Sequence, residues 1–184
     1  MTDTDTSPQS AYFMGHEVEE IEKRTLAVLV DNEPGVLARV VGLFSARGYN
    51  IDSLTVAEVD ASKHRSRITI VTQGTPHTLE QIEAQLLSLV PVGKVIDITR
   101  SKRGVERELA VVKVAGEGEP RVEALRIAQI FRANVIDTTN ESFIFELTGT
   151  SDKISQFIEL MRPLGLVEVS RTGVLSIKRG KELG

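Results

Sequence analysis

Residues 26–59 read LAVLVDNEPGVLARVVGLFSARGYNIDSLTVAEV, and this stretch decides the fold. The apolar run at 26–30 has the length of a buried strand, and a polar turn follows it. Apolar residues at helical spacing then predict a helix over 34–47, which Gly48 ends. The alternating residues at 51–59 predict a second strand. The stretch therefore predicts a strand, a turn, a helix and a strand in that order.

The same unit is completed downstream and then repeated. The β-branched segment RITIVT at 67–72 predicts an antiparallel return strand, a helix capped by Thr78 follows, and residues 92–99 supply a last strand. The order of elements is βαββαβ. The second copy comprises strands at 109–114, 135–138, 142–148 and 166–170, a helix over 120–132 and a helix capped by Ser151. This self-similarity indicates an internal repeat with some drift in loop length.

A βαββαβ unit folds as a ferredoxin-like sandwich, in which four antiparallel strands carry both helices on one face. We therefore expect an α+β protein built from two tandem ferredoxin-like sandwiches. The predicted boundaries are 1–24 for a disordered acidic extension, 25–99 for the first domain and 100–184 for the second.

Two apolar strand segments bear on self-association. ITIV at 68–71 and FIF at 143–145 have apolar positions that cannot all face the helices. Such a surface favours a two-fold homodimer. The alternative is that these residues pack between the two halves of one chain.

Composition and charge exclude several classes of protein. The net charge of −4 arises in the first 24 residues, where six acidic residues accompany two basic ones, so the remaining body is neutral and offers no basis for nucleic-acid binding. No apolar run is long enough to span a membrane and the N-terminus lacks a signal sequence, so we expect a cytoplasmic protein with no membrane partner. Cysteine is absent, and His16, His64 and His77 lie in polar segments, so we expect no metal site.

No convergent set of titratable residues predicts catalysis, and two binding motifs are weak. Gly116 and Gly118 precede a predicted helix as in a dinucleotide loop, but the third glycine is missing and the flanking glutamates would repel a pyrophosphate. Phe143 and Phe145 are spaced like the stacking aromatics of an RNA-binding sheet. The neutral body and the adjacent Glu146 oppose that role.

The turn DNEPG is the best candidate for a ligand site. The first N–H groups of a helix have no intrahelical partner and favour an anion, so this turn could accept a carboxylate without a basic side chain. Gly35 would let a ligand approach the backbone, and Asn32 offers an amide. In the alternative interpretation Asn32 is only an N-cap and Pro34 only a first-turn proline. These residues alone leave both interpretations open.

A resemblance favours the ligand site. The turn DNEPGVL, the helix end RGYNI and the strand start IDSLTV look like the ACT domain, a small regulatory ligand-binding module. Together with SRITIV and LEQIEAQLLSLVPVGKV, the first half resembles the small regulatory subunit family of acetolactate synthase (acetohydroxyacid synthase). The second half resembles the C-terminal domain of that family through RELAVVKV, IFRANVIDTT, LTGTSDKI and SRTGVLSIKRG. The likeness spans about residues 25–180.

The resemblance implies a regulatory protein without catalytic residues or cofactors of its own. Thiamine diphosphate, Mg²⁺ and FAD would belong to a catalytic large subunit that condenses two pyruvates, or pyruvate with 2-ketobutyrate. This chain would activate that subunit and confer feedback inhibition by valine, or by leucine or isoleucine, in branched-chain amino-acid biosynthesis. An ACT-type amino-acid sensor for another enzyme, or one acting alone, is the alternative.

The resemblance also places the effector site. In the family, ACT domains form a side-by-side homodimer with valine between a turn of one protomer and a loop of the other. The corresponding residues are Asn32, Gly35, Val36 and Leu37 on the first lip, and Asn50 and Ile51 on the second lip, from the partner chain. Many ACT domains have aspartate at the position of Asn32. The second unit has Glu119, Pro120 and Arg121 at the equivalent turn and lacks the GYN segment, so we expect only residues 25–99 to bind the effector.

Overall fold

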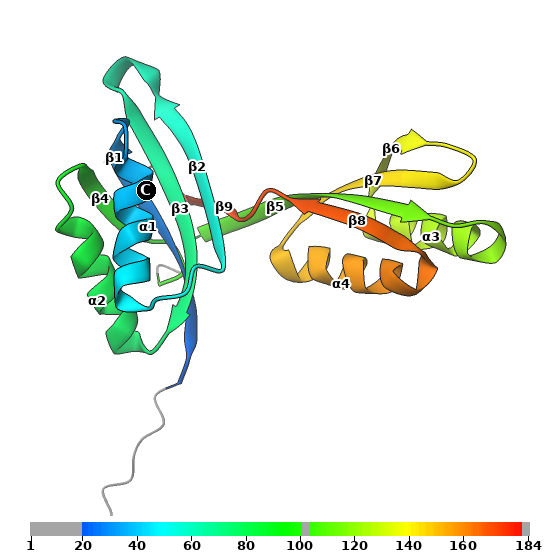
Figure 1. Ribbon diagram of the computed structural model, residues 1–184, viewed down its shortest axis with the longest axis horizontal. Coiled ribbons are helices and arrows are strands. Elements are labelled where there is room, and N and C mark those ends of the chain that lie inside the picture. The colour runs from blue at the N-terminus through cyan, green and yellow to red at the C-terminus, as the bar shows by residue number, and fades with distance from the viewer. Residues whose placement is uncertain (1–19, 101–103, 182–184) are drawn as a thin grey trace, which may run out of the picture.

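The computed structural model describes residues 20–100 and 104–181. Figure 1 shows two bodies, each with a sheet and two long helices on one face, joined by a narrow ribbon of strands. The first body has the antiparallel strand order β2-β3-β1-β4. Its elements are β1 (Glu22–Asp31), α1 (Val36–Arg47), β2 (Ser53–Asp60), the 3-10 turn η1 (Ala61–Lys63), β3 (Arg65–Gly74), α2 (Pro76–Leu87) and β4 (Val92–Asp97).

The second body repeats this arrangement with the strand order β6-β7-β5-β8. Its elements are β5 (Gly104–Ala115), α3 (Gly118–Phe131), β6 (Asn134–Thr138), β7 (Ser142–Gly149), α4 (Ser151–Met161), the 3-10 turn η2 (Arg162–Leu164), β8 (Leu166–Arg171) and β9 (Leu175–Lys178). The two tandem βαββαβ sandwiches of an α+β protein are therefore confirmed. β9 was not expected from the sequence, and it pairs with the first four residues of β5.

The first strand begins earlier than expected. β1 starts at Glu22, within the segment assigned to the acidic extension, because Arg24 is buried and pairs with Asp97 of β4 at 3.3 Å. Residues 1–19, the rest of the predicted extension, lie outside the described residues.

Each body has its own apolar core between its sheet and its helices. In the first, the α1 residues Val36, Val40 and Phe44 pack with alternate residues of β1 and β3. In the second, the rings of Phe145 and Phe157 meet edge to face with centroids 6.1 Å apart. Two separate cores are what the internal repeat requires, because each unit must bury its own helix stripe.

Two helix caps differ from the expected ones. The hydroxyl of Thr75, not that of Thr78, caps α2 and accepts from the Thr78 N–H. Likewise Thr150, not Ser151, caps α4. The preceding threonine takes each cap because its extended backbone directs the hydroxyl toward the first turn.

The ribbon of β9 and the start of β5 covers the face of the first sheet opposite its helices (Figure 1). The Arg67 guanidinium donates to the Ser176 carbonyl at 2.8 Å across this contact. Thr69 and Val71, which face away from the helices, are 4 % and 2 % exposed. The ribbon thus covers the ITIV segment, so these residues pack between the two halves of one chain. The segment therefore gives no support to self-association.

The FIF segment does not form a stacking surface. Phe143 and Phe145 both belong to the second core, where they are 7 % and 0 % exposed. The guanidinium of Arg121 also lies 3.8 Å from the centre of the Phe143 ring. The structure therefore contradicts the RNA-binding alternative, because neither ring is open to a base.

His64 and His77 are exposed, as expected, and His16 lies outside the described residues. Over residues 20–100 and 104–181, no helix combines the length and apolar character needed to cross a membrane. The same ranges contain no group of His, Asp or Glu side chains arranged to hold a metal ion.

An ion pair with a buried carboxylate joins β5 to β8 in the second body. Arg171 donates to both carboxylate oxygens of Glu108 at 2.6 and 2.7 Å, and the Ser151 hydroxyl donates to the same carboxylate at 2.9 Å. These hydrogen bonds hold the pKa of Glu108 below its ordinary value despite its burial.

The pair predicts a pH-dependent stability. Because the folded-state pKa of Glu108 is lowered, its contribution is fully present above the unfolded-state pKa, about 4.3, and is lost as the pH falls through the lower folded-state value. We expect the difference in free energy of unfolding between wild type and Glu108→Gln to shrink over this range. Denaturant titrations between pH 7 and pH 3 measure it, with Glu141→Gln as control, since that exposed carboxylate makes no hydrogen bond or ion pair within the described residues. A difference that stays constant over this range would contradict the assignment.

Candidate functional site

The turn between β1 and α1 is held open by a left-handed glycine. Gly35 is the N-cap of α1 with φ 84°, and no side chain caps the helix. The interpretation of Asn32 as the N-cap is therefore wrong. Its backbone N–H instead donates to the His64 carbonyl at 2.6 Å and its amide to Glu58 at 3.4 Å, because the chain still follows the β2–β3 hairpin at that point. Pro34 precedes the helix, which starts at Val36.

The helix N-terminus presents unpaired donors. Within the described residues, the N–H groups of Gly35, Leu37 and Ala38 have no acceptor, whereas the Val36 N–H donates to the Glu33 carbonyl at 3.3 Å. Gly35 is exposed, and a Cβ built on it would meet nothing within 4 Å. This turn can therefore accept a carboxylate by backbone donors alone, as the helix dipole favours. Leu37 is exposed beside it, but the Val36 side chain is buried in the core and could offer only backbone.

The second predicted lip lies at the other end of the helix. Gly48 ends α1 with φ 68°, as expected. Asn50 follows, with its carbonyl accepting from the Thr72 hydroxyl at 2.6 Å and its amide donating to Asp52 at 2.7 Å. Ile51 is half-buried against the first core. The helix has 12 residues and is about 18 Å long, so the two lips of one chain are too far apart to hold one amino acid.

A second copy of the chain could bring the lips together through β2. This strand is an edge of the first sheet (Figure 1), with Asn50 and Ile51 just before its start and Asn32 bonded to Glu58 near its end. Antiparallel pairing of two β2 edges about a two-fold axis would place the start of one strand beside the end of the other. Each first lip would then face the partner's second lip.

Exposed apolar side chains accompany this edge. Leu37 and Val41, one helical turn apart on α1, are 38 % and 37 % exposed, and Val56 of β2 is 44 % exposed. Val56 pairs with Ile68, a core residue, so it lies on the helix-covered side of the sheet. These are the side chains that a side-by-side neighbour would cover.

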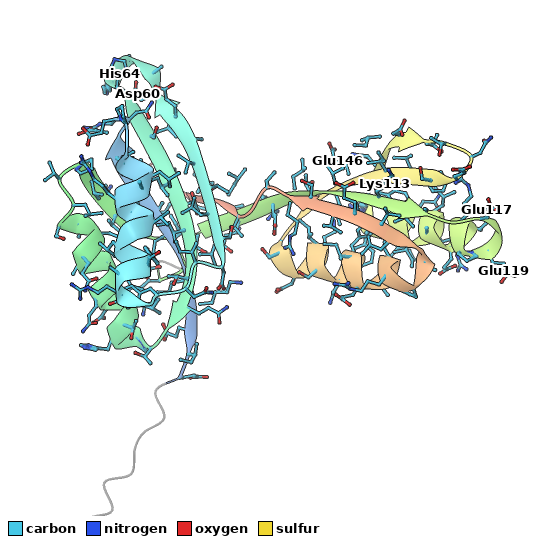
Figure 2. All side chains as sticks on the ribbon, in the orientation of Figure 1. Asp60, His64, Lys113, Glu117, Glu119 and Glu146 are labelled. Atoms are coloured by element: carbon cyan, nitrogen blue, oxygen red, sulfur yellow. The ribbon has the colours of Figure 1, made fainter. Side chains whose placement is uncertain are left out.

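The contribution of the hairpin tip was missed by the sequence analysis. His64 has the left-handed backbone conformation, with φ 47°, and its carbonyl fixes Asn32. Figure 2 shows His64 and Asp60 together at this tip. The Ser62 hydroxyl and the Lys63 N–H donate to Asp60, which lowers the pKa of that carboxyl. The polar run DASKHRS predicted a loop but not its contact with Asn32.

An arginine connects the equivalent turn of the second unit to the loop between β6 and β7. α3 begins at Gly118, earlier than expected, and the Arg121 guanidinium donates to the Thr139 carbonyl at 2.7 Å while lying over Phe143. Figure 2 places Glu117 and Glu119 at this turn, at the end of the second body far from the first. Carboxylates at this position disfavour a pyrophosphate.

Two family models match the chain. One, described as an AHAS small subunit-like ACT domain, matches residues 26–94, and the other, small subunit of acetolactate synthase, matches residues 107–180. A probable acetolactate synthase small subunit of Archaeoglobus fulgidus is 48 % identical, over 87 % of this chain and 99 % of the relative. The isozyme 3 small subunit of Escherichia coli is 45 % identical, over 88 % and 98 %.

The fold has a solved counterpart. The crystal structure of the acetolactate synthase small subunit of Thermotoga maritima superposes with a TM-score of 0.78 at 38 % identity. The match covers 88 % of this chain and 99 % of that one. The likeness thus includes both bodies.

Proposed function

The chain belongs to the acetolactate synthase small-subunit family, and on that basis we propose that it activates a catalytic large subunit and confers feedback inhibition on it. The proposed effector is valine, or leucine or isoleucine, the branched-chain end products of the pathway. The proposed location is the cytoplasm. Thiamine diphosphate, Mg²⁺ and FAD would be held by the catalytic partner, and this chain would supply regulation only.

One observation supports the effector site above all: the uncapped N-terminus of α1, opened by left-handed Gly35, follows the turn that is bonded to β2, an edge strand of the sheet in the described residues. The backbone N–H groups of Leu37 and Ala38 would donate hydrogen bonds to the carboxylate of an amino acid. The partner's second lip carries Asp52 close to Asn50, and a carboxylate there suits an ammonium group. The exposed apolar side chains at the edge would contact the branched side chain.

The proposed mechanism follows from this division of the site between two chains. An amino acid that bridges two protomers stabilises the homodimer arrangement in which both lips meet, and the catalytic subunit responds to that arrangement. The available coupling is limited to the differential affinity of the effector for the two arrangements, typically about 1–3 kcal/mol.

The proposal can be tested by calorimetry and by co-elution. Titration of the purified full-length chain with valine, leucine and isoleucine should give saturable binding for at least one of them. The expected stoichiometry is one effector per chain, because each first lip pairs with one second lip of the partner. Size-exclusion chromatography with the catalytic subunit should give one larger complex. Binding of an amino acid without association with the catalytic subunit would favour the alternative, an ACT-type sensor for another enzyme. Absence of binding to all three would reject the effector site.

A further inference from the structure

The strand that carries the second lip is fastened to the second domain by two side chains. Ser53 Oγ accepts from the Val174 N–H at 3.0 Å, and Thr55 Oγ1 donates to the Val174 carbonyl at 3.2 Å. Alternate residues of β2 thus hold both backbone groups of one residue just before β9. We call this set, Ser53, Thr55 and Val174, the β2 clamp.

A glycine permits this close approach. Gly173 has φ 82°, and a Cβ at this position would lie 2.6 Å from Ser53 Oγ and 3.1 Å from Thr55 Cγ2. Either distance is too short for an unshifted side chain. A side chain at position 173 would therefore displace the Ser53 hydroxyl from its place in the clamp, and it would be strained at φ 82°.

On one side the clamp is continuous with the second lip. Ser53 follows Asn50 by three positions. Between them, the Asp52 carboxylate accepts a hydrogen bond from the Asn50 amide. The Asp52 N–H donates to the Val71 carbonyl at 2.8 Å, so this part of the chain is fixed to β3. A shift of the second lip on ligand binding must therefore displace the start of β2.

On the other side the clamp is tied to the second sheet. Thr172, two residues before Val174, exchanges hydrogen bonds with Leu109 at 3.0 and 3.1 Å. Arg171 makes the ion pair with the buried carboxylate of Glu108. Val174 thus follows, within three positions, two residues that are bonded to β5 of the second domain.

Around the clamp the two domains are loosely packed. Cavities of about 520 and 490 Å³ lie between them, and Lys23 and Asp152 line both. The neighbouring contact from Arg67 to the Ser176 carbonyl belongs to β3 rather than to β2. The clamp is therefore the place where the strand of the second lip itself bonds to the segment leading into the second domain.

We propose that the β2 clamp transmits effector occupancy from the lips to the second domain, which makes Ser53 and Thr55 positioning residues of feedback inhibition. This inference rests on the proposed function, since it assumes an effector at the lips. Neither residue needs to touch the effector. Their role is to make the position of the second domain depend on the position of β2.

The test separates effector binding from inhibition. The double variant Ser53→Ala/Thr55→Val, in the full chain reconstituted with its catalytic subunit, should bind valine within about twofold of wild type. The valine concentration for half-maximal inhibition should rise at least about fivefold, the lower end of typical allosteric couplings, while activation is retained. Because coupling is reciprocal, the catalytic subunit should change the valine affinity of wild type but not of the double variant.

Two further variants complete the test. Thr55→Ser keeps the hydroxyl and should retain inhibition, whereas Thr148→Val, the same exchange as Thr55→Val but on an exposed strand position of the second domain, should change nothing. If the double variant were inhibited at wild-type valine concentrations, the proposed role of the clamp would be rejected. Loss of valine binding together with loss of inhibition would also reject it, because the two residues would then act on binding itself. A wild-type protein that neither binds valine, leucine or isoleucine nor confers inhibition would overturn the proposed function instead.

Discussion

Gly35→Asp is expected to abolish valine binding and feedback inhibition while leaving activation of the catalytic subunit largely intact. The new carboxylate would occupy the helix N-terminus where the carboxylate of the effector is proposed to bind, and like charges repel there. A side chain at φ 84° is strained and should cost about 1–3 kcal/mol of stability, but the fold should tolerate the change, since a Cβ at Gly35 meets nothing within 4 Å and aspartate adopts the left-handed conformation more readily than most residues. Calorimetry and inhibition assays of the reconstituted enzyme measure the two effects.

The second domain offers a matched control. Gly118 also begins a helix with a positive φ, 62°, and has open space around its missing Cβ. Gly118→Asp should therefore leave valine inhibition unchanged. If Gly35→Asp were still inhibited at wild-type valine concentrations, the effector site would be assigned to the wrong place.

Val56→Glu is expected to dissociate the homodimer and, with it, the effector site. The substitution puts a carboxylate on each of the two edges that would pair, and burial of an unpaired charge strongly opposes association. Sedimentation should show a particle of 20.2 kDa in place of one of twice that mass. Valine binding should disappear in parallel, because the two lips come from different chains.

Val167→Glu is the corresponding control on the second domain. Val167 is 58 % exposed at a register shift of β8, an edge strand of the second sheet, so the same side-chain exchange is made at an exposed apolar edge position. This variant should remain dimeric and valine-sensitive. A Val56→Glu protein that stayed dimeric would exclude the β2 edge as the interface.

The sequence predicts the order of the elements because each carries a strong periodic signal. Val36, Val40 and Phe44 are spaced four residues apart, which is typical of a helix that packs one face against an apolar sheet. The short strand β9 has four residues, and its partner is the start of β5, far away in sequence, so no local pattern indicates it. The covering of Thr69 and Val71 by the ribbon was unpredictable for the same reason.

The candidate site was partly predictable for a different reason. The turn with Gly35 is a local feature, and its left-handed glycine and open N–H groups follow from chain chemistry. The contact of Asn32 with the hairpin tip depends on tertiary structure. The meeting of Asn32 with the partner's Asn50 depends on a second chain, and it stays a prediction from the resemblance and from the free edge of β2.

The central claim is tested most directly by the acetolactate formed by the catalytic subunit, measured with and without this chain and with and without valine. We predict that the chain raises the rate and that valine lowers it only when the chain is present, with leucine and isoleucine tested in parallel. A rate that does not change on addition of the chain, or an inhibition that is the same in its absence, would contradict the account.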